Sequence, residues 1–159
     1  MSLVSDVPAP ETTAPAASPS GREQLEALMR RTDGEIAGIG HVLGFKLTEV
    51  GVGEVVFEGT PGRSVYNPIG AVHGGYAATL LDSACGCAVH STLAANQGYT
   101  TLELKVAYHR AMTEATGPVR AEGKVVQVGR RAAFAEATLK GLDGKLYASA
   151  TSTLLVFER

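Results

Sequence analysis

The segment from His73 to Ala95 constrains the fold most, because it is apolar on nearly every side. A helix of this kind must be surrounded by other parts of the protein. Asp82 and His90 interrupt the segment, which favours a buried helix over a membrane span. Glycine is unfavourable inside a helix, so Gly74 and Gly75 are expected in its first turn. The other small residues let a neighbouring backbone approach closely: Ala77, Ala78, Ala84, Gly86 and Ala88.

Strand patterns flank this predicted helix on both sides. Short connections such as Gly129 to Arg131 and Gly141 to Gly144 predict antiparallel neighbours. A short amphipathic helix, Gly21 to Arg31, precedes the first strand pattern. The pattern therefore predicts an α+β fold in which one long buried helix is wrapped by a curved antiparallel sheet. The expected strands are Phe45 to Val50, Gly53 to Thr60, Thr100 to Arg110, Val119 to Val128, Ala132 to Lys140 and Lys145 to Phe157.

Length and composition suit one domain. The chain has 159 residues, and residues 1–20 are so rich in Pro, Ala, Ser and Thr that a disordered tail is expected there. Residues 21–159 then form a single domain. A formal net charge of -2 and the lack of a basic run argue against nucleic-acid binding. The start of the chain lacks the pattern of a signal peptide, so a cytoplasmic protein is expected.

The two cysteines, Cys85 and Cys87, are expected to be free thiols. Residues two apart on a helix point to nearly opposite sides, so these two cannot easily bridge each other. Small buried thiols fit a reducing compartment. Cys87 and His90 lie one helical turn apart, but no second pair completes a metal site. No metal and no cofactor are expected.

The run Asn67-Pro-Ile-Gly70-Ala-Val-His73-Gly74-Gly75, followed by Asp82, resembles the hotdog-fold thioesterase superfamily. It is most similar to the PaaI-type branch of the phenylacetate pathway, which shows Asn-x-x-Gly-x-x-His-Gly-Gly and then an acidic residue. The resemblance implies a hotdog fold and acyl-CoA thioesterase activity. It also implies a homodimer whose sheets join edge to edge, often assembled further into a homotetramer, with active sites shared between two chains.

Two residues carry the chemistry that the resemblance implies. Gly74 matches the family's oxyanion donor, and a backbone N–H at a helix N-terminus suits that role. The alternative is that the glycines only allow close packing, and both statements can hold. Asp82 lies on an apolar helix, where an unpaired carboxylate is expensive to bury. It is expected to act either as general base on water or as a direct nucleophile, rather than as a paired structural residue.

Three further residues are expected at the site. Asn67 is assigned as an amide donor to the thioester carbonyl, against the alternative of a turn residue before Pro68. His73 is given a positioning role. Thr101 matches the hydroxyl residue that assists the attacking water. However, strict alternation puts Thr101 on the face of Glu103, so either the strand start is irregular or the hydroxyl reaches a site across the dimer.

The coenzyme A arm is assigned to a turn and a strand end. Arg130 and Arg131 could pair with its phosphates, although a solvated turn explains them equally well. Tyr108 could line the pantetheine channel or be a core residue. The composition favours neither aryl-acyl nor fatty acyl thioesters.

Two other functions compete with hydrolysis. A hotdog enoyl-CoA hydratase or dehydratase needs a catalytic His paired with an acid, which His73 and Asp82 could imitate. A non-catalytic module would only bind acyl-CoA. The Gly-Ala-Val-His-Gly-Gly context and the presence of Asp82 favour the thioesterase.

Overall fold

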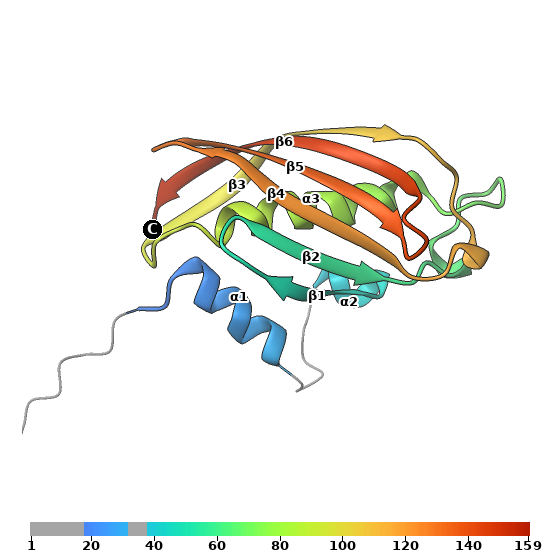
Figure 1. Ribbon diagram of the computed structural model, residues 1–159, viewed down its shortest axis with the longest axis horizontal. Coiled ribbons are helices and arrows are strands. Elements are labelled where there is room, and N and C mark those ends of the chain that lie inside the picture. Colours follow the sequence, from blue (N-terminus) through green and yellow to red (C-terminus); the bar gives the residue numbers. More distant parts are fainter. Residues whose placement is uncertain (1–17, 32–37) are drawn as a thin grey trace, which may run out of the picture.

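The computed structural model describes residues 18–31 and 38–159. In these ranges a six-stranded sheet curves over one long helix, α3 (Figure 1). The strand order is β1-β2-β4-β5-β6-β3, so β1 and β3 are the two edges. Every neighbouring pair is antiparallel, as predicted. The strands are β1 (Phe45–Val50), β2 (Glu54–Gly59), β3 (Gln97–Tyr108), β4 (Val119–Val128), β5 (Ala132–Gly141) and β6 (Leu146–Glu158).

Helix α3 (Gly74–His90) is the centre of the core, as its all-round apolar sequence predicts. Leu80 and Leu81 are completely buried beneath the sheet. A fully buried leucine stabilises the fold by about 1.5–3 kcal/mol. A Cβ at Gly123 of β4 would lie 2.2 Å from the carbonyl oxygen of Ala84, so the sheet backbone rests directly on the helix. The small residues of α3 therefore have the predicted purpose of close approach.

Helix α3 ends at His90, whereas the apolar pattern predicts a helix to Ala95. The hydroxyl groups that follow explain the difference. Ser91 Oγ donates to the carbonyl of Ala88 at 2.7 Å, and Thr92 Oγ1 donates to the carbonyl of Val89 at 2.7 Å. Such local side-chain bonds compete with continuation of the helix.

Strand β3 begins at Gln97, three residues before the prediction, and its predicted strict alternation is wrong. Its register with β6 shifts between Thr101 and Glu103, so Leu102 is a β-bulge. Strict alternation puts Leu102 on the face opposite Glu103, with the apolar residues, but Leu102 is 62% exposed. The bulge reverses the parity of the strand, and Thr101 consequently faces α3.

The first helix, α1 (Gly21–Arg30), begins with a capping box in which Ser20 and Glu23 each bond the other's backbone N–H. Gly21 packs against the end of α3, where a Cβ would lie 1.9 Å from the carbonyl oxygen of His90. The sequence misses the short helix α2 (Ile39–Leu43), and the 3₁₀ turns η1 (Arg63–Val65) and η2 (Glu114–Thr116). The predicted disordered tail lies outside the described residues, apart from residues 18–20.

Both cysteines are free thiols. Burial raises the pKa of Cys85 to about 12 and that of Cys87 to about 11, which makes them poor nucleophiles near neutral pH. None of the helices in residues 18–31 and 38–159 has the length and apolar character needed to cross a membrane.

Candidate active site

The loop before α3 is organised by the side chain of Asn67. Its Oδ1 accepts hydrogen bonds from the backbone N–H of Ile69 at 3.1 Å and of Ala71 at 3.2 Å. Because both partners are donors, the orientation of the amide is fixed, and Nδ2 has no partner within the described chain. The turn needs Gly70, whose φ of +87° is unfavourable for other residues. Asn67 is therefore both a turn residue and an available donor.

His73 is the N-cap of α3. Its Nδ1 accepts a hydrogen bond from the backbone N–H of Gly75 at 2.8 Å, which places the ring proton on Nε2. A Cβ at Gly75 would lie 2.9 Å from this nitrogen, so the second glycine of the motif makes room for the ring. His73 therefore fixes the first turn of α3, and its role at an active site stays a prediction.

Gly74 is the first residue of α3, and its backbone N–H has no hydrogen-bond partner in the part of the chain that the structure describes. Tyr108, the last residue of β3, lies against it. The Tyr108 hydroxyl donates to the Gly74 carbonyl at 3.1 Å, and a Cβ at Gly74 would lie 3.1–3.2 Å from the tyrosine ring and hydroxyl. Tyr108 is 57% exposed, so the interpretation of it as a core residue is wrong.

Asp82 lies half-buried in the middle of α3 and meets Thr101. The Thr101 Oγ1 donates to Asp82 Oδ1 at 3.0 Å. The second carboxylate oxygen, Oδ2, has no hydrogen bond to any described residue. The bulge at Leu102 makes this contact possible, because it turns Thr101 toward the helix. The first of the two alternatives for Thr101, an irregular strand, is therefore confirmed.

One chain does not bring all of the predicted residues together. Asp82 lies about 12 Å further along the α3 axis than Gly74, since a helix rises about 1.5 Å per residue. Arg130 and Arg131 lie in the exposed β4–β5 hairpin, at the end of the sheet where α3 terminates (Figure 1). The motif loop lies at the opposite end of α3.

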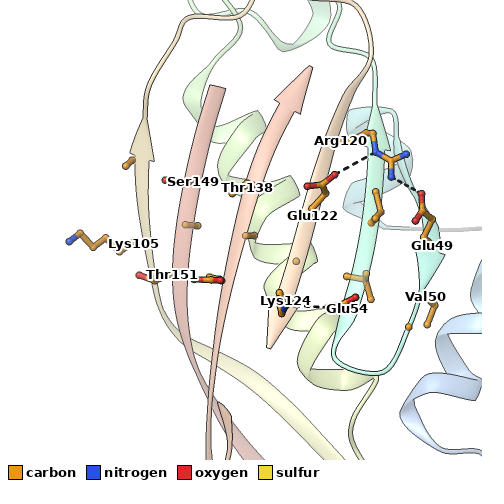
Figure 2. Close-up of a pocket in the computed structure, with 18 residues that line it drawn as sticks. Glu49, Val50, Glu54, Lys105, Arg120, Glu122, Lys124, Thr138, Ser149 and Thr151 are labelled. Carbon is orange, nitrogen blue, oxygen red and sulfur yellow. Dashed lines mark hydrogen bonds and ion pairs between the residues drawn. The ribbon is translucent and has the colours of Figure 1, made fainter. Parts of the chain in front are cut away.

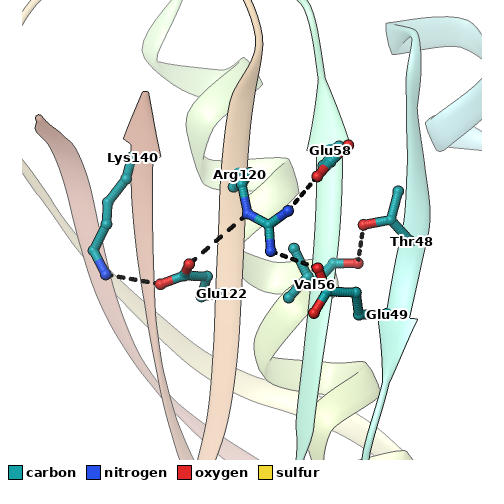
Figure 3. A network of polar contacts seen from close by, with 7 residues as sticks. All are labelled: Thr48, Glu49, Val56, Glu58, Arg120, Glu122 and Lys140. Carbon is teal, nitrogen blue, oxygen red and sulfur yellow. Dashed lines mark hydrogen bonds and ion pairs between the residues drawn. The ribbon is translucent and has the colours of Figure 1, made fainter. Parts of the chain in front are cut away.

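A hollow of about 910 Å³ lies on the outer face of the sheet, away from α3 (Figure 2). None of the predicted catalytic residues lines it. Figure 3 shows that its charged rim is largely paired, with Arg120 joined to Glu49 at 2.6 Å and to Glu58 at 2.5 Å. Lys140 is joined to Glu122 at 2.7 Å. The alternation of charges in β2 and β4 is the only sequence signal for this network, and we assign no chemistry to it.

Comparisons with known proteins identify a family and a fold for the chain. The family model of the thioesterase superfamily matches residues 69–148, which are half of the chain and include Gly74 and Asp82. A Halobacterium salinarum protein named as a candidate esterase is 46% identical over 71 residues, which are 42% of this chain and 44% of that protein. The match thus spans less than half of that curated relative.

Two solved structures share the fold. A conserved protein of Pseudomonas aeruginosa is 28% identical with a TM-score of 0.71, over 79% of this chain and 98% of that one. A mutant of the phenylacetic acid degradation protein PaaI from Thermus thermophilus is 27% identical with a TM-score of 0.66, over 73% and 96% of the two chains.

Proposed function

This chain belongs to the thioesterase superfamily and has the hotdog fold of its PaaI-type branch, and we propose that it hydrolyses acyl-CoA thioesters to a free acid and CoA. The observation that carries the proposal is the half-buried carboxylate of Asp82, held by Thr101 through one oxygen and free at the other. A carboxylate so placed on an apolar helix reduces stability, so its presence there favours a functional role.

Asp82 supplies the attack on the thioester carbonyl. As general base, its free oxygen takes a proton from water while the water oxygen bonds to the carbonyl carbon. As nucleophile, it bonds to that carbon itself, and water then hydrolyses the mixed anhydride. In both cases the C–S bond breaks and the CoA sulfur leaves as a thiolate that takes up a proton. Thr101 orients the carboxylate or the water.

Gly74 and Asn67 polarise the carbonyl. The oxyanion that forms at the tetrahedral stage accepts a hydrogen bond from the Gly74 N–H, aided by the positive end of α3. The free Nδ2 of Asn67 provides a second donor near the same loop. His73 does not serve as an acid or base in this scheme, because its Nδ1 is used as the helix cap.

Two chains are needed to complete this site. A carbonyl attacked at Asp82 must have its oxygen within about 3 Å of the oxyanion donor. The 12 Å rise between Asp82 and Gly74 of one chain, estimated at about 1.5 Å per residue, is too large for that. We therefore assign the Gly74 donor to the neighbouring subunit.

Strand β3 is the edge that fits this exchange. Its last residue, Tyr108, bonds to Gly74, and Thr101, earlier in the strand, bonds to Asp82. If β3 pairs with its own copy around a two-fold axis at Lys105, Glu103 faces Ala107 of the copy. The bulge at Leu102 then brings Thr101 opposite Tyr108 of the copy, with both side chains on the α3 side. This register places each Asp82 near the other chain's Gly74.

Cysteine cross-linking tests the register without any substrate. Lys105→Cys lies on the proposed axis and should give a disulfide-linked dimer, because facing residues in an antiparallel pair have Cα atoms about 4.5–5.5 Å apart. Glu103→Cys and Ala107→Cys should each cross-link poorly alone and well when combined. Efficient linkage of either single variant, without linkage of Lys105→Cys, contradicts the register. The wild-type protein, which carries only Cys85 and Cys87, is the control for linkage through the native thiols.

The CoA arm and the assembly complete the proposal. The exposed side chains of Arg130 and Arg131 form no ion pair with the described residues, so they are available to CoA phosphates. We propose a cytoplasmic homodimer or homotetramer. The two free cysteines support a reducing compartment.

A panel of acyl-CoA thioesters with a thiol-trapping dye tests the function. We expect thiol release from at least one aryl or fatty acyl-CoA, and a loss of about 10²–10⁴-fold in kcat for Asp82→Asn. Hydration of an enoyl-CoA without thiol release would instead indicate a hydratase. Binding of acyl-CoA without turnover would indicate a binding module. Full activity of Asp82→Asn would sink the mechanism.

A further inference from the structure

The peptide units at the start of α3 are held at nearly every polar atom. The peptide that joins Gly74 to Gly75 has its N–H bonded to His73 Nδ1 at 2.8 Å and its carbonyl bonded to the Tyr108 hydroxyl at 3.1 Å. In the preceding peptide, the His73 carbonyl accepts from the N–H of Tyr76 at 3.0 Å. The Gly74 N–H is the one group in these two peptides without a partner among the described residues.

Such a clamp matters because the sequence here is Gly-Gly. Two consecutive glycines have more backbone freedom than any other pair of residues. An oxyanion donor is effective only if its direction is fixed before the reaction. The hydrogen bonds of α3 order the carbonyl side of these glycines, but the first N–H groups of a helix have no partner within it, so side chains must fix the N–H side.

Tyr108 supplies rigidity from a different element. It closes the long strand β3, while Gly74 opens α3, so their contact joins the strand to the first turn of the helix. Its ring occupies the space beside Gly74 in which a Cβ would lie, 3.1–3.2 Å away, and its hydroxyl bonds the Gly74 carbonyl. The contact restrains Gly74 on this side, and a larger residue there would displace the Tyr108 ring.

We propose that Tyr108 is a positioning residue, which holds the Gly74–Gly75 peptide together with His73 and so pre-orients the Gly74 N–H toward the developing oxyanion. This inference rests on the proposed thioester hydrolysis. It differs from the assignment of Tyr108 to the pantetheine channel, because a channel wall contacts the substrate and affects binding. A positioning residue affects the chemical step through Gly74.

The decisive variant is Tyr108→Phe, which keeps the ring and removes only the hydroxyl. We expect kcat to fall about tenfold, a fraction of the roughly 10²–10³-fold effect of a whole oxyanion donor, with KM within about twofold of wild type. Tyr99→Phe is the matched control, since it removes a hydroxyl from the same strand where the ring packs on Gly86. It should leave kcat within about twofold of wild type. A rise in KM at unchanged kcat for Tyr108→Phe would return Tyr108 to the CoA channel and overturn the proposal.

A second measurement tests the clamp without catalysis. Backbone ¹⁵N relaxation of Gly74 and Gly75 should show increased mobility in Tyr108→Phe and no change in Tyr99→Phe. Equal rigidity of both amides in all three proteins would overturn the proposal. If the wild-type protein hydrolyses no acyl-CoA, the proposed function fails, whereas the relaxation data still decide whether Tyr108 orders this turn.

Discussion

Helix α3 meets strand β3 at two glycine–tyrosine contacts with opposite surroundings. At Gly86, a Cβ would lie 2.7–3.0 Å from the hydroxyl and ring of Tyr99, and the glycine is fully buried. A Cβ at Gly74 would likewise lie 3.1–3.2 Å from the ring and hydroxyl of Tyr108, but this tyrosine is 57% exposed. The first contact closes the core. The second leaves a backbone N–H without a partner and accessible to a substrate.

Asp82 lies between these glycines, and Thr101 lies between these tyrosines. The same kind of contact, a glycine of α3 against a tyrosine of β3, therefore serves two purposes on one helix. The contact stabilises the core where the chain covers it, as at Gly86, and exposes a backbone N–H where the chain leaves it open, as at Gly74. Substitutions at the two contacts should therefore separate activity from stability.

The largest effect is expected at the exposed contact. Gly74→Val pushes a branched side chain into the Tyr108 ring and displaces the oxyanion donor. We expect kcat to fall by about 10²-fold or more. The free energy of unfolding should change by less than about 1 kcal/mol, because the partner ring can move into solvent. Steady-state kinetics and thermal unfolding measure the two effects, and a loss of stability without a loss of kcat would contradict the comparison.

The buried contact should respond in the opposite way. Gly86→Ala overpacks the space filled by Tyr99 and should cost roughly 1–3 kcal/mol of stability. The melting temperature should fall by about 2–4 °C per kcal/mol for a chain of this size. The kcat of the folded fraction should remain within about threefold of wild type. A large fall in kcat at unchanged melting temperature would show that this contact also belongs to the site.

A smaller effect is expected midway between the contacts. Thr101→Val keeps the shape of the side chain and removes the hydroxyl that bonds Asp82, so kcat should fall about tenfold, the value of one modest hydrogen bond in the transition state. Thr100→Val is the control, because Thr100 is exposed on the other side of the strand. Equal losses in both variants would argue against a specific role for Thr101.

The smallest effect is a pH dependence of stability at the buried end. Burial, reinforced by Arg159, lowers the pKa of His90, whose Nε2 lies 3.3 Å from Gln24 Oε1. The unfolded chain then binds the proton more readily, since an unperturbed histidine has a pKa of about 6.5. Stability should be fully present above that value and decrease as the pH falls below it. Urea unfolding at several pH values should show a weaker dependence in His90→Gln.

The sequence predicts the parts of this molecule that depend on local pattern. The all-round apolar run predicts the buried helix, and the antiparallel strands follow from the short connections between them. The motif brings Gly74, Asp82 and Asn67 to attention because their residue types and spacing are unusual. These features need no knowledge of what lies across the sheet.

Other features depend on contacts between distant segments, and the sequence does not reveal them. The bulge at Leu102 breaks a convincing alternation, so Thr101 is assigned to the wrong face by parity. The end of α3 depends on the hydroxyls of Ser91 and Thr92, although an apolar run continues beyond them. The contact between Gly74 and Tyr108 is hidden in the same way, because it joins the start of a helix to the end of a later strand.

The central claim is that Asp82 of one chain acts with Gly74 of its partner. A heterodimer purified through two different tags, with one chain carrying Asp82→Asn and the other Gly74→Val, tests it directly. If the site is shared, one of its two sites combines an intact Asp82 with an intact Gly74. We therefore predict about half of the wild-type kcat per dimer, while both homodimers are inactive. A heterodimer as inactive as the two homodimers would contradict the shared site.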